Sequence, residues 1–551
     1  MPGASASRVL IVGLDCAAPR FVFDPNRLPL PNLHALMARG RWGTLRSCDP
    51  PITVPAWSCM TTGLDAGALG VYGFRNRRDR SYEGLSLASG NDIRAKRLWD
   101  YAGDAGMESV VLGVPQTYPP RPMRGALVSG LLTPSTRVQF THPPELATEL
   151  RERVGEYLID VPEFRSADSA ELLKRIHALM QNRFDLAEYL ARSRDWSLFM
   201  LVEIGLDRLH HAFWQYSDPA HPVFEPGNPY EIAIPDYYRA LDERIGRLVA
   251  LARDDTAVLV VSDHGARALQ GGFGINQWLV QRGYLVLRES PAQARPLTAD
   301  LVDWSRTRAW GEGGYYARVN INVRGREPEG VVPEAEYDAF RDHLAGEIET
   351  IQGPDGAPLG NRVLKPEAVY ATVEGIPPDL FVYFGGLSWR SIGQVGGGVF
   401  WRGNDTGPDG ANHDFDGVFI LDDRSGGPGM RVDGASLFDV APTVLSLLGL
   451  RVPAEVRGRD LRGGRPMKVA VYIAGKAPGA GGGEEHFLRK SIEALSEMHP
   501  APDITLLTDP DNSGGYDGLK AIPVSSPKDV PGALAKSGAE VFLTGLELVP
   551  D

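Results

Sequence analysis

The chain carries several short, continuous runs of apolar residues, many of them β-branched. Residues 8–14 (RVLIVGL) form one such run, and others occupy 109–114, 196–203, 256–262 and 417–421. Runs of this length without polar alternation predict strands that are buried on both faces. We therefore expect a sheet whose strands lie in the interior of the protein.

Helical patterns separate these runs, over 168–193, 230–253 and 436–448. Strands that alternate with helices predict an α/β fold with a doubly wound sheet, parallel or mixed. From about 280 to 410 the apolar runs become fewer and glycine and proline become frequent, with one helix expected over 333–350. We expect this part to be an inserted cap subdomain.

The end of the chain follows a stretch rich in glycine and arginine at 457–466. Beyond it, apolar runs and one helical segment, at 484–498, repeat a β-α-β pattern that is too short for a complete doubly wound domain. The sequence thus predicts a main domain over 1–465 and a small α/β unit, half of a Rossmann-type fold, over 466–551.

Composition places the chain among ordinary soluble globular proteins. Hydrophobic residues make up 43% and charged residues 23% of the 551 positions, which argues against disorder or a coiled coil. Acidic residues outnumber basic ones by 70 to 57, and a net charge of -13 gives no general attraction to a nucleic-acid polymer or an anionic membrane. Local features must therefore hold any anionic substrate.

The cysteines and the start of the chain bear on its compartment. Cys16, Cys48 and Cys59 form no paired motif, which suggests neither a disulfide framework nor a thiolate metal site. The first residues lack the pattern of a signal peptide, and no apolar stretch is long enough to span a membrane. We expect a cytoplasmic protein without a membrane anchor.

Aspartate and histidine residues follow the apolar runs at several places that are far apart in the sequence. They are Asp15, the pair Asp207 and His211, and the pair Asp263 and His264; a further histidine, His413, lies in a loop rich in glycine and aspartate. Carboxylate and imidazole ligands without thiolates suit zinc or a similar divalent cation in a hydrolytic site. Together these residues predict a metal centre.

Each of these residues also has a plainer interpretation. A strand-terminal aspartate such as Asp15 is often a helix cap or a turn former. Asp207 and His211, at i and i+4, lie on one face of a helix and fit a surface contact as well as a ligand pair. The sequence Ser-Asp-His-Gly at 262–265 favours a functional role over a structural one, because two adjacent polar residues of ligand type at the end of an apolar strand have little structural purpose. His413 also fits an ordinary polar loop.

A second signal surrounds Thr53. Prolines at 50, 51 and 55 favour an extended approach to a helix that should begin near Pro55, and they place the threonine hydroxyl close to the first helical amides. Those amides and the helix dipole favour the negative charge of an alkoxide or a bound phosphate. Taken alone, the threonine fits a simple helix cap equally well.

Taken together, these motifs resemble those of a known family. Asp15, the TVPAW segment at 53–57, the spaced Asp207 and His211, the SDHG segment at 262–265 and His413 resemble the type I phosphodiesterase and nucleotide pyrophosphatase branch of the alkaline phosphatase superfamily. The resemblance covers about 8–465 and leaves out the tail. It implies an alkaline-phosphatase-like fold and a hydrolase acting on phosphate esters.

The resemblance also implies a role for each residue of the motifs. One divalent cation, zinc with manganese as the alternative, is expected to be held by Asp15, Asp263, His264 and the oxygen of Thr53. A second is expected to be held by Asp207, His211 and His413. The family pattern makes Thr53 the nucleophile, with a phospho-threonine intermediate that water then displaces.

The substrate is not fixed by these residues. A small phosphorylated molecule is expected, with nucleotides and nucleotide sugars among the candidates. Where many relatives carry a His-Gly pair after the nucleophile helix, this chain has Ala68-Leu69-Gly70. Just beyond, Arg75 and Asn76 fit a phosphate contact, and they also fit a solvated basic loop.

Three other functions compete with a phosphodiesterase. The same site would serve a phosphomonoesterase or a phosphomutase that passes the phosphoryl group to a second hydroxyl. An inactive scaffold kept for binding is a third alternative, and the complete ligand set argues against it. Aromatic residues of the insertion, such as Trp304, Trp310 and Tyr315, either stack on a base or sugar or belong to the core.

Overall fold

The computed structural model describes residues 7–162, 164–165 and 168–463, together with four strands of the tail at 468–473, 503–508, 520–523 and 541–544. The chain divides into two compact units, Met1–Gly458 and Arg459–Asp551. The first unit contains every residue of the predicted site.

The described residues of the first unit form a central sheet of ten strands. Its strands in spatial order are β22 (Met430–Arg431), β2 (Arg41–Arg46), β21 (Asp416–Asp422), β9 (Thr256–Val261), β1 (Arg8–Leu14), β8 (Leu198–Glu203), β5 (Ser109–Leu112), β6 (Gly125–Val128) and β7 (Thr141–His142), with β23 (Ala435–Ser436) beside β2. The run from β9 to β6 is parallel, whereas β21 and β7 are antiparallel to their neighbours. The predicted α/β fold with a mixed sheet is confirmed.

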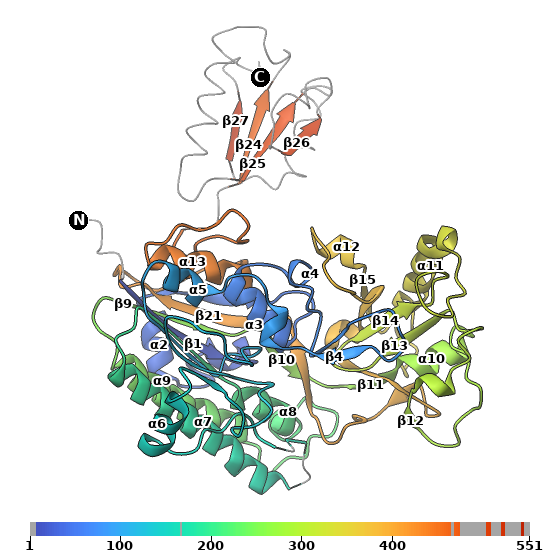
Figure 1. Ribbon diagram of the computed structural model, residues 1–551, viewed down its shortest axis with the longest axis horizontal. Helices are drawn as coiled ribbons and strands as arrows, with labels where there is room; N and C mark the ends of the chain where they lie inside the picture. The colour runs from blue at the N-terminus through green and yellow to red at the C-terminus, as the bar shows by residue number, and fades with distance from the viewer. Residues whose placement is uncertain are drawn as a thin grey trace. The chain divides into compact units, whose positions relative to one another are not determined.

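Helices cover both faces of this sheet (Figure 1). Those on one face are α2 (Pro31–Met37), α7 (Ser169–Ser193), α8 (Gly205–Ser217) and α9 (Ala233–Val249), with α6 (Leu146–Arg153) at the edge; those on the other are α3 (Thr53–Thr62), α5 (Leu98–Asp104) and α13 (Val440–Leu447). Two short helices, α1 (Pro19–Val22) and α4 (Ala66–Leu69), complete this part.

Strand β1 shows why the sheet is buried on both sides. Leu10, Val12 and Leu14 point into the core shared with α7, α8 and α9. The intervening Gly13 faces α3 instead, where the Trp57 ring lies so close that an added Cβ would come within 2.5 Å of its Cη2 atom. A glycine is therefore needed at this position for the α3 helix to approach the sheet.

The cap is built from small sheets between β10 (Gly265–Ala268) and β20 (Ala411–Asp414), which pair with each other. Its strands are β11 (Gly271–Gly274), β12 (Arg295–Pro296), β13 (Ala309–Glu312), β14 (Ala317–Ile321), β15 (Arg362–Leu364), β16 (Leu380–Tyr383), β17 (Trp389–Ile392), β18 (Gln394–Val395) and β19 (Phe400–Trp401). Its helices are α10 (Ile275–Gln281), α11 (Tyr337–Glu349) and α12 (Pro366–Val369), and a core of its own joins them.

A hairpin from early in the sequence also belongs to the cap. Strands β3 (Arg75–Arg77) and β4 (Leu85–Leu87) pair with each other, and the Tyr82 ring between them stacks on Trp304 with centroids 3.5 Å apart. The Tyr82 hydroxyl also donates a hydrogen bond to Asn322 at 2.9 Å. Such a long-range contact leaves no local pattern, so the sequence did not predict it.

In the second unit, the described backbone comprises four parallel strands. In spatial order they are β26 (Lys520–Pro523), β25 (Asp503–Thr508), β24 (Lys468–Ile473) and β27 (Val541–Thr544). The helix predicted at 484–498 lies outside the described residues. The domain boundary at 465 stays a prediction.

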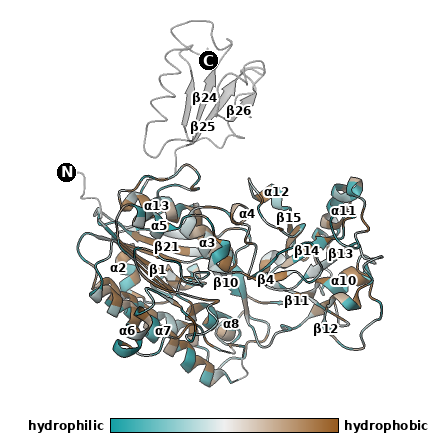
Figure 2. Cartoon of the chain, viewed as in Figure 1, coloured by the Kyte–Doolittle hydropathy of each residue, from teal (hydrophilic) through white to brown (hydrophobic). Residues whose placement is uncertain are grey.

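Hydropathy follows the layers of the first unit. Figure 2 shows hydrophobic residues concentrated on the central strands and hydrophilic ones on outer helices such as α6 and α11. Within the described part of the chain, every helix is too short or too polar to cross a membrane.

We predict that Gly13→Ala lowers the free energy of unfolding of the first unit by about 1–3 kcal/mol, because the new Cβ would overlap Trp57 and lie 2.9 Å from the Leu201 carbonyl oxygen. Gly346→Ala, in α11 with no atom within 4 Å of the added Cβ, is the matched control and should be neutral or stabilising by up to about 1 kcal/mol. Urea unfolding followed by tryptophan fluorescence measures both. Equal stability of the two variants would contradict the packing argument.

Candidate metal centre

The predicted aspartates meet at one edge of the sheet because their strands are neighbours. Strand β1 lies between β9 and β8, and all three are parallel, so their carboxyl ends coincide. Asp15 directly follows β1, and Asp263 follows β9 by two residues. Asp207 and His211 lie one turn apart in α8, which begins just after β8.

His413 reaches this edge through the β10–β20 ribbon. In this antiparallel pair Ala266 lies opposite His413, only two residues beyond His264. The rings of His264 and His413 stack with centroids 3.8 Å apart. The ribbon thus brings together two histidines that are far apart in the sequence, at the point where the cap begins and ends.

The six residues form two groups, each of which could hold a metal ion. We call Asp15, Asp263 and His264 the first group, and Asp207, His211 and His413 the second group; within each group the ligand atoms lie within 4.8 Å of one another. All six side chains are buried. The structure therefore brings together the residues that the sequence predicted for each metal.

Distances in the first group centre on the Nε2 atom of His264. This nitrogen is 3.1 Å from Asp263 Oδ2 and 3.7 Å from Asp15 Oδ1. The hydroxyl oxygen of Thr53 lies 3.4 Å from the same nitrogen. Four potential ligand atoms of the chain thus surround one small space.

Distances in the second group are similar. His211 Nε2 lies 3.3 Å from Asp207 Oδ1 and 3.3 Å from His413 Nε2. His413 Nε2 is 3.6 Å from the same Asp207 oxygen. Ligand atoms about 2.1 Å from a shared tetrahedral cation lie about 3.4 Å from each other, so both groups have the spacing of a metal site.

The hydrogen bonds of the three aspartates also fit a metal site. Each has one carboxylate oxygen held by a neighbour and one buried oxygen, Asp15 Oδ1, Asp207 Oδ1 or Asp263 Oδ2, with no hydrogen-bond partner among the described residues. The held oxygens accept from the Trp57 indole (2.7 Å), the Arg208 guanidinium (2.7 Å) and the Cys16 amide (3.1 Å). A buried carboxylate oxygen without a donor is costly, and a cation would remove that cost.

The histidines are oriented in the same way. The Nδ1 atom of His413 is 3.0 Å from the Pro51 carbonyl oxygen, and that of His264 is 3.1 Å from the Gly265 carbonyl oxygen. For His211 the partner is the Asp409 carboxylate at 2.8 Å. A proton on each Nδ1 leaves the Nε2 lone pair free for a metal, as is usual for histidine ligands.

Asp409 is a candidate site residue that the sequence did not predict. Its side chain is fully buried, and Arg165 and Arg390 pair with it at 3.0 and 3.2 Å. It lies in the same glycine- and aspartate-rich loop as His413, where nothing local distinguishes it from Asp414 or Asp416. Its contact with His211 sets it apart, because that contact orients the ring of a candidate metal ligand.

The electrostatics of the first group favour protons when no cation is bound. Burial, together with the negative charge of neighbouring carboxylates, raises the pKa of Asp15 and that of Asp263 well above their usual range. Burial lowers the pKa of His264 to about 4. Without a cation, the electrostatics therefore favour protonation of the acids and, at neutral pH, an uncharged His264 imidazole.

The second group is organised as an ion pair. Burial alone would raise the pKa of Asp207, but the charges of His211 and Arg208 outweigh it and lower that pKa well below its usual range. Burial alone would lower the pKa of His211, but Asp409 and other negative groups raise it well above normal. A bound cation would take the place of the His211 proton.

Thr53 stands at the amino end of a buried helix. It is the first residue of α3, two positions earlier than the predicted start, and Ile52 is the cap. All ten residues of α3 are buried, so the helix terminus and its free amides point into the protein interior beside the first group.

The two predicted phosphate contacts lie in strand β3, at the edge of the cap. Arg75 lines a pocket there. Asn76 uses its amide locally, accepting from the Tyr72 amide at 2.7 Å and donating to the Gly73 carbonyl at 3.1 Å. Among the contacts of the described residues, none joins either side chain to the six predicted metal ligands.

Known proteins resemble this chain in sequence family and in fold. The family described as type I phosphodiesterase / nucleotide pyrophosphatase matches residues 9–409. A phosphonoacetate hydrolase from Sinorhizobium meliloti 1021 has a similar fold, with a TM-score of 0.51, 16% identity and coverage of 81% of this chain and 96% of that one. Human ectonucleotide pyrophosphatase / phosphodiesterase 5 gives a TM-score of 0.48 at 14% identity, covering 82% and 97%. None of the curated proteins compared matches the sequence.

Fold and site define a metal-dependent hydrolase of the alkaline phosphatase superfamily that acts on phosphoric ester bonds. The chain belongs to the type I phosphodiesterase / nucleotide pyrophosphatase family. The resemblance seen in the sequence motifs is thereby confirmed.

We predict that Asp409→Asn weakens binding of the second cation about tenfold to a hundredfold, because the amide cannot hold His211 as the carboxylate does. Metal content after equilibrium dialysis measures the effect. Asp416→Asn, an exposed change close by in the sequence, is the control and should bind metal as the wild type does. An unchanged metal content in Asp409→Asn would show that the contact does not orient His211.

The pKa directions also predict a pH dependence. Because Asp15, Asp263 and His211 have raised pKa values, the stability that these three groups contribute to the metal-free protein is lost as pH rises through those values. A divalent cation replaces the protons, so the rise in melting temperature on adding metal should be larger at pH 8 than at pH 5.5. Calorimetry at the two values tests this, and a larger rise at pH 5.5 would contradict it.

Proposed function

We propose that this protein hydrolyses phosphodiesters, with Thr53 as the nucleophile and two divalent cations in the two groups. The observation that carries the proposal is that three orphaned carboxylate oxygens and three imidazole Nε2 atoms form two neighbouring groups, with the Thr53 hydroxyl 3.4 Å from one of these nitrogens. Carboxylate and imidazole ligands suit zinc best, with manganese as the alternative.

Each group has a separate part in the proposal. The first group and Thr53 would hold one cation, and the second group would hold the other. When bound, the cations would lower the pKa of the Thr53 hydroxyl and stabilise negative charge that develops on the phosphoryl oxygens. A phospho-threonine would form on Thr53 and then be displaced by water.

The chain itself positions the nucleophile. Pro55 has no amide hydrogen, and the Ala56 amide donates to the Ile52 carbonyl at 3.0 Å, so the unpaired amides at this helix end are those of Thr53 and Val54. The dipole of α3 adds positive potential at the same point. Trp57, one turn further on, fixes the Asp15 carboxylate.

The family match supports a diester as the substrate class, because the matched family is described as type I phosphodiesterase / nucleotide pyrophosphatase. The complete set of ligands argues against an inactive scaffold.

We predict that the metal-loaded protein cleaves bis-p-nitrophenyl phosphate faster than p-nitrophenyl phosphate. Thr53→Ala should lower diester turnover about a thousandfold or more, because the variant lacks the hydroxyl that lies 3.4 Å from the His264 Nε2 atom. Release of p-nitrophenol is the measurement, with metal content determined on the same samples.

Thr53→Ser is the matched variant, since it keeps the hydroxyl and should retain much of the activity. Unchanged turnover in Thr53→Ala would exclude the threonine as nucleophile. A preference for the monoester would favour a phosphatase or a phosphomutase instead.

A further inference from the structure

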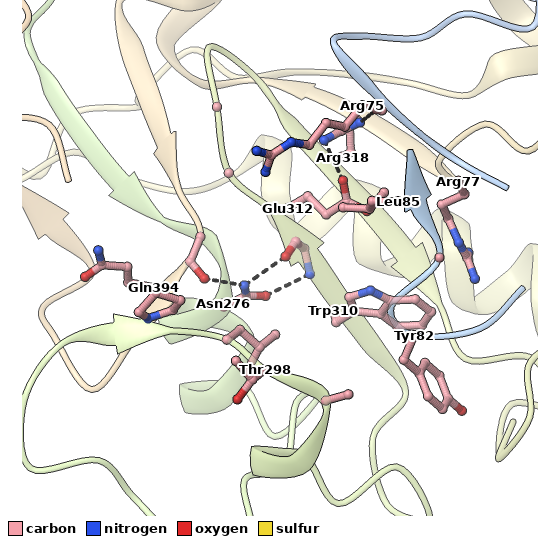
Figure 3. A pocket seen from close by; sticks show the side chains of 18 of the residues that line it. Arg75, Arg77, Tyr82, Leu85, Asn276, Thr298, Trp310, Glu312, Arg318 and Gln394 are labelled. Carbon is pink, nitrogen blue, oxygen red and sulfur yellow. Dashed lines mark hydrogen bonds and ion pairs between the residues drawn. The ribbon is translucent and has the colours of Figure 1, made fainter. Parts of the chain in front are cut away.

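A pocket of about 550 Å³ lies in the cap, between the β3–β4 hairpin and the cap strands (Figure 3). Four arginines line it, against two acidic residues. The arginines are Arg75, Arg77, Arg318 and Arg390, and the acids are Glu312 and Asp405. In a chain with a net charge of -13, such a local excess of positive charge indicates an anionic ligand.

This pocket adjoins the metal centre through one aromatic ring. Gly313 and Gly314 line the pocket and directly precede Tyr315, whose ring stacks on His413 with centroids 4.1 Å apart. The guanidinium carbon of Arg390 lies 4.7 Å from the centre of the same ring. A ligand with one group at the metals can therefore extend toward the pocket.

The aromatic walls of the pocket offer little surface for stacking a base. Tyr82 and Trp304 stack on each other at 3.5 Å, and Trp310 meets both rings edge-on. Arg77 lies over the Trp310 ring at 5.4 Å. These faces already have partners within the protein, so the pocket favours polar groups over a nucleobase.

The four arginines differ in how many of their N–H donors already contact other residues. Arg77 faces Glu327 at 3.6 Å, and Arg318 pairs with Glu312 at 2.5 Å and donates to the Arg75 carbonyl. Figure 3 shows Arg75 and Arg318 next to each other near Glu312. Their remaining capacity to bind an added anion is small.

Arg75 and Arg390 keep side-chain N–H donors that could bind an added anion. The Arg75 side chain is exposed and has no ion-pair partner among the described residues. Arg390 is buried, pairs with Asp409 through Nη1, and has an Nε atom without a hydrogen-bond partner in the described part of the chain. A planar guanidinium suits two-point contact with phosphate or carboxylate oxygens.

We propose that this pocket binds a second anionic group of the substrate, a phosphate or a carboxylate, with Arg75 as its main contact. The inference rests on the proposed function and adds the class of substrate: a phosphodiester in which one of the two esterified alcohols also carries a compact anion. The chemistry at the metals then acts on one end of the molecule while the cap recognises the other.

Three synthetic diesters test this inference. Each is a p-nitrophenyl aryl phosphate, and the second aryl group carries hydrogen, a carboxylate or a phosphate at its para position. Binding is measured by calorimetry with metal-loaded Thr53→Ala protein, which should bind them without turnover. We expect the charged diesters to bind about tenfold more tightly than the neutral one, and the stronger of the two identifies the anion.

Arg75→Ala, added to Thr53→Ala, should reduce this preference to less than about twofold. Arg78→Ala is the matched control, since Arg78 is an exposed arginine of the same segment that does not line the pocket, and it should leave the preference intact. Equal affinities for the three diesters, no binding of the charged ones, or a preference that survives Arg75→Ala would overturn the inference.

Turnover of the same diesters by protein that retains Thr53 separates this inference from the proposed function. Hydrolysis without any preference for the charged diesters would leave the function standing and remove the anion site. No hydrolysis, together with a binding preference that depends on Arg75, would leave the anion site standing and remove the function.

Discussion

Three carboxylates buried side by side, each with one oxygen left without a donor, are the constraint on which the rest of the site depends. Asp15 and Asp263 follow two adjacent parallel strands, and Asp207 lies in the first turn of the helix after a third; among the described residues, no lysine or arginine reaches their unpaired oxygens. Burial of such groups is unfavourable unless protons or cations compensate. The histidines, Trp57 and the helix α3 are arranged so that a cation can do so.

The sequence predicted the parts of the site that depend on the order of strands. A polar residue that follows an apolar strand can be recognised in the sequence itself, and parallel strands bring their carboxyl ends together. Asp15, Asp207 and Asp263 could therefore be predicted to lie in one site. His413 was grouped with them by family resemblance, because the β10–β20 pairing that carries it leaves no local signal.

Asp409 and the β3–β4 hairpin could not be found in this way. The role of Asp409 comes from one contact with His211 across 198 residues of sequence, and its neighbours in the loop include other aspartates. The hairpin belongs to the cap only because Tyr82 stacks on Trp304. Both features arise from tertiary packing, which periodicity and spacing do not encode.

The sequence left two interpretations of the aromatic residues Trp304 and Trp310, stacking on a base or sugar and packing in the core. Both residues belong to the cap core.

The candidate metal groups and the cap pocket lie in different layers of one unit. Ligands at the sheet edge are fixed by the main sheet and its helices, whereas the pocket is built from cap strands and a hairpin. Tyr315 and Arg390 join the two, because the Tyr315 ring packs on His413 and Arg390 pairs with Asp409 behind His211. A change in the cap at Arg390 would therefore act on the second group as well, while a change at Arg75 would alter recognition alone. This difference follows from which side chains share a hydrogen-bond network: Arg390 contacts Asp409, whereas no ion pair of the described residues involves the Arg75 side chain.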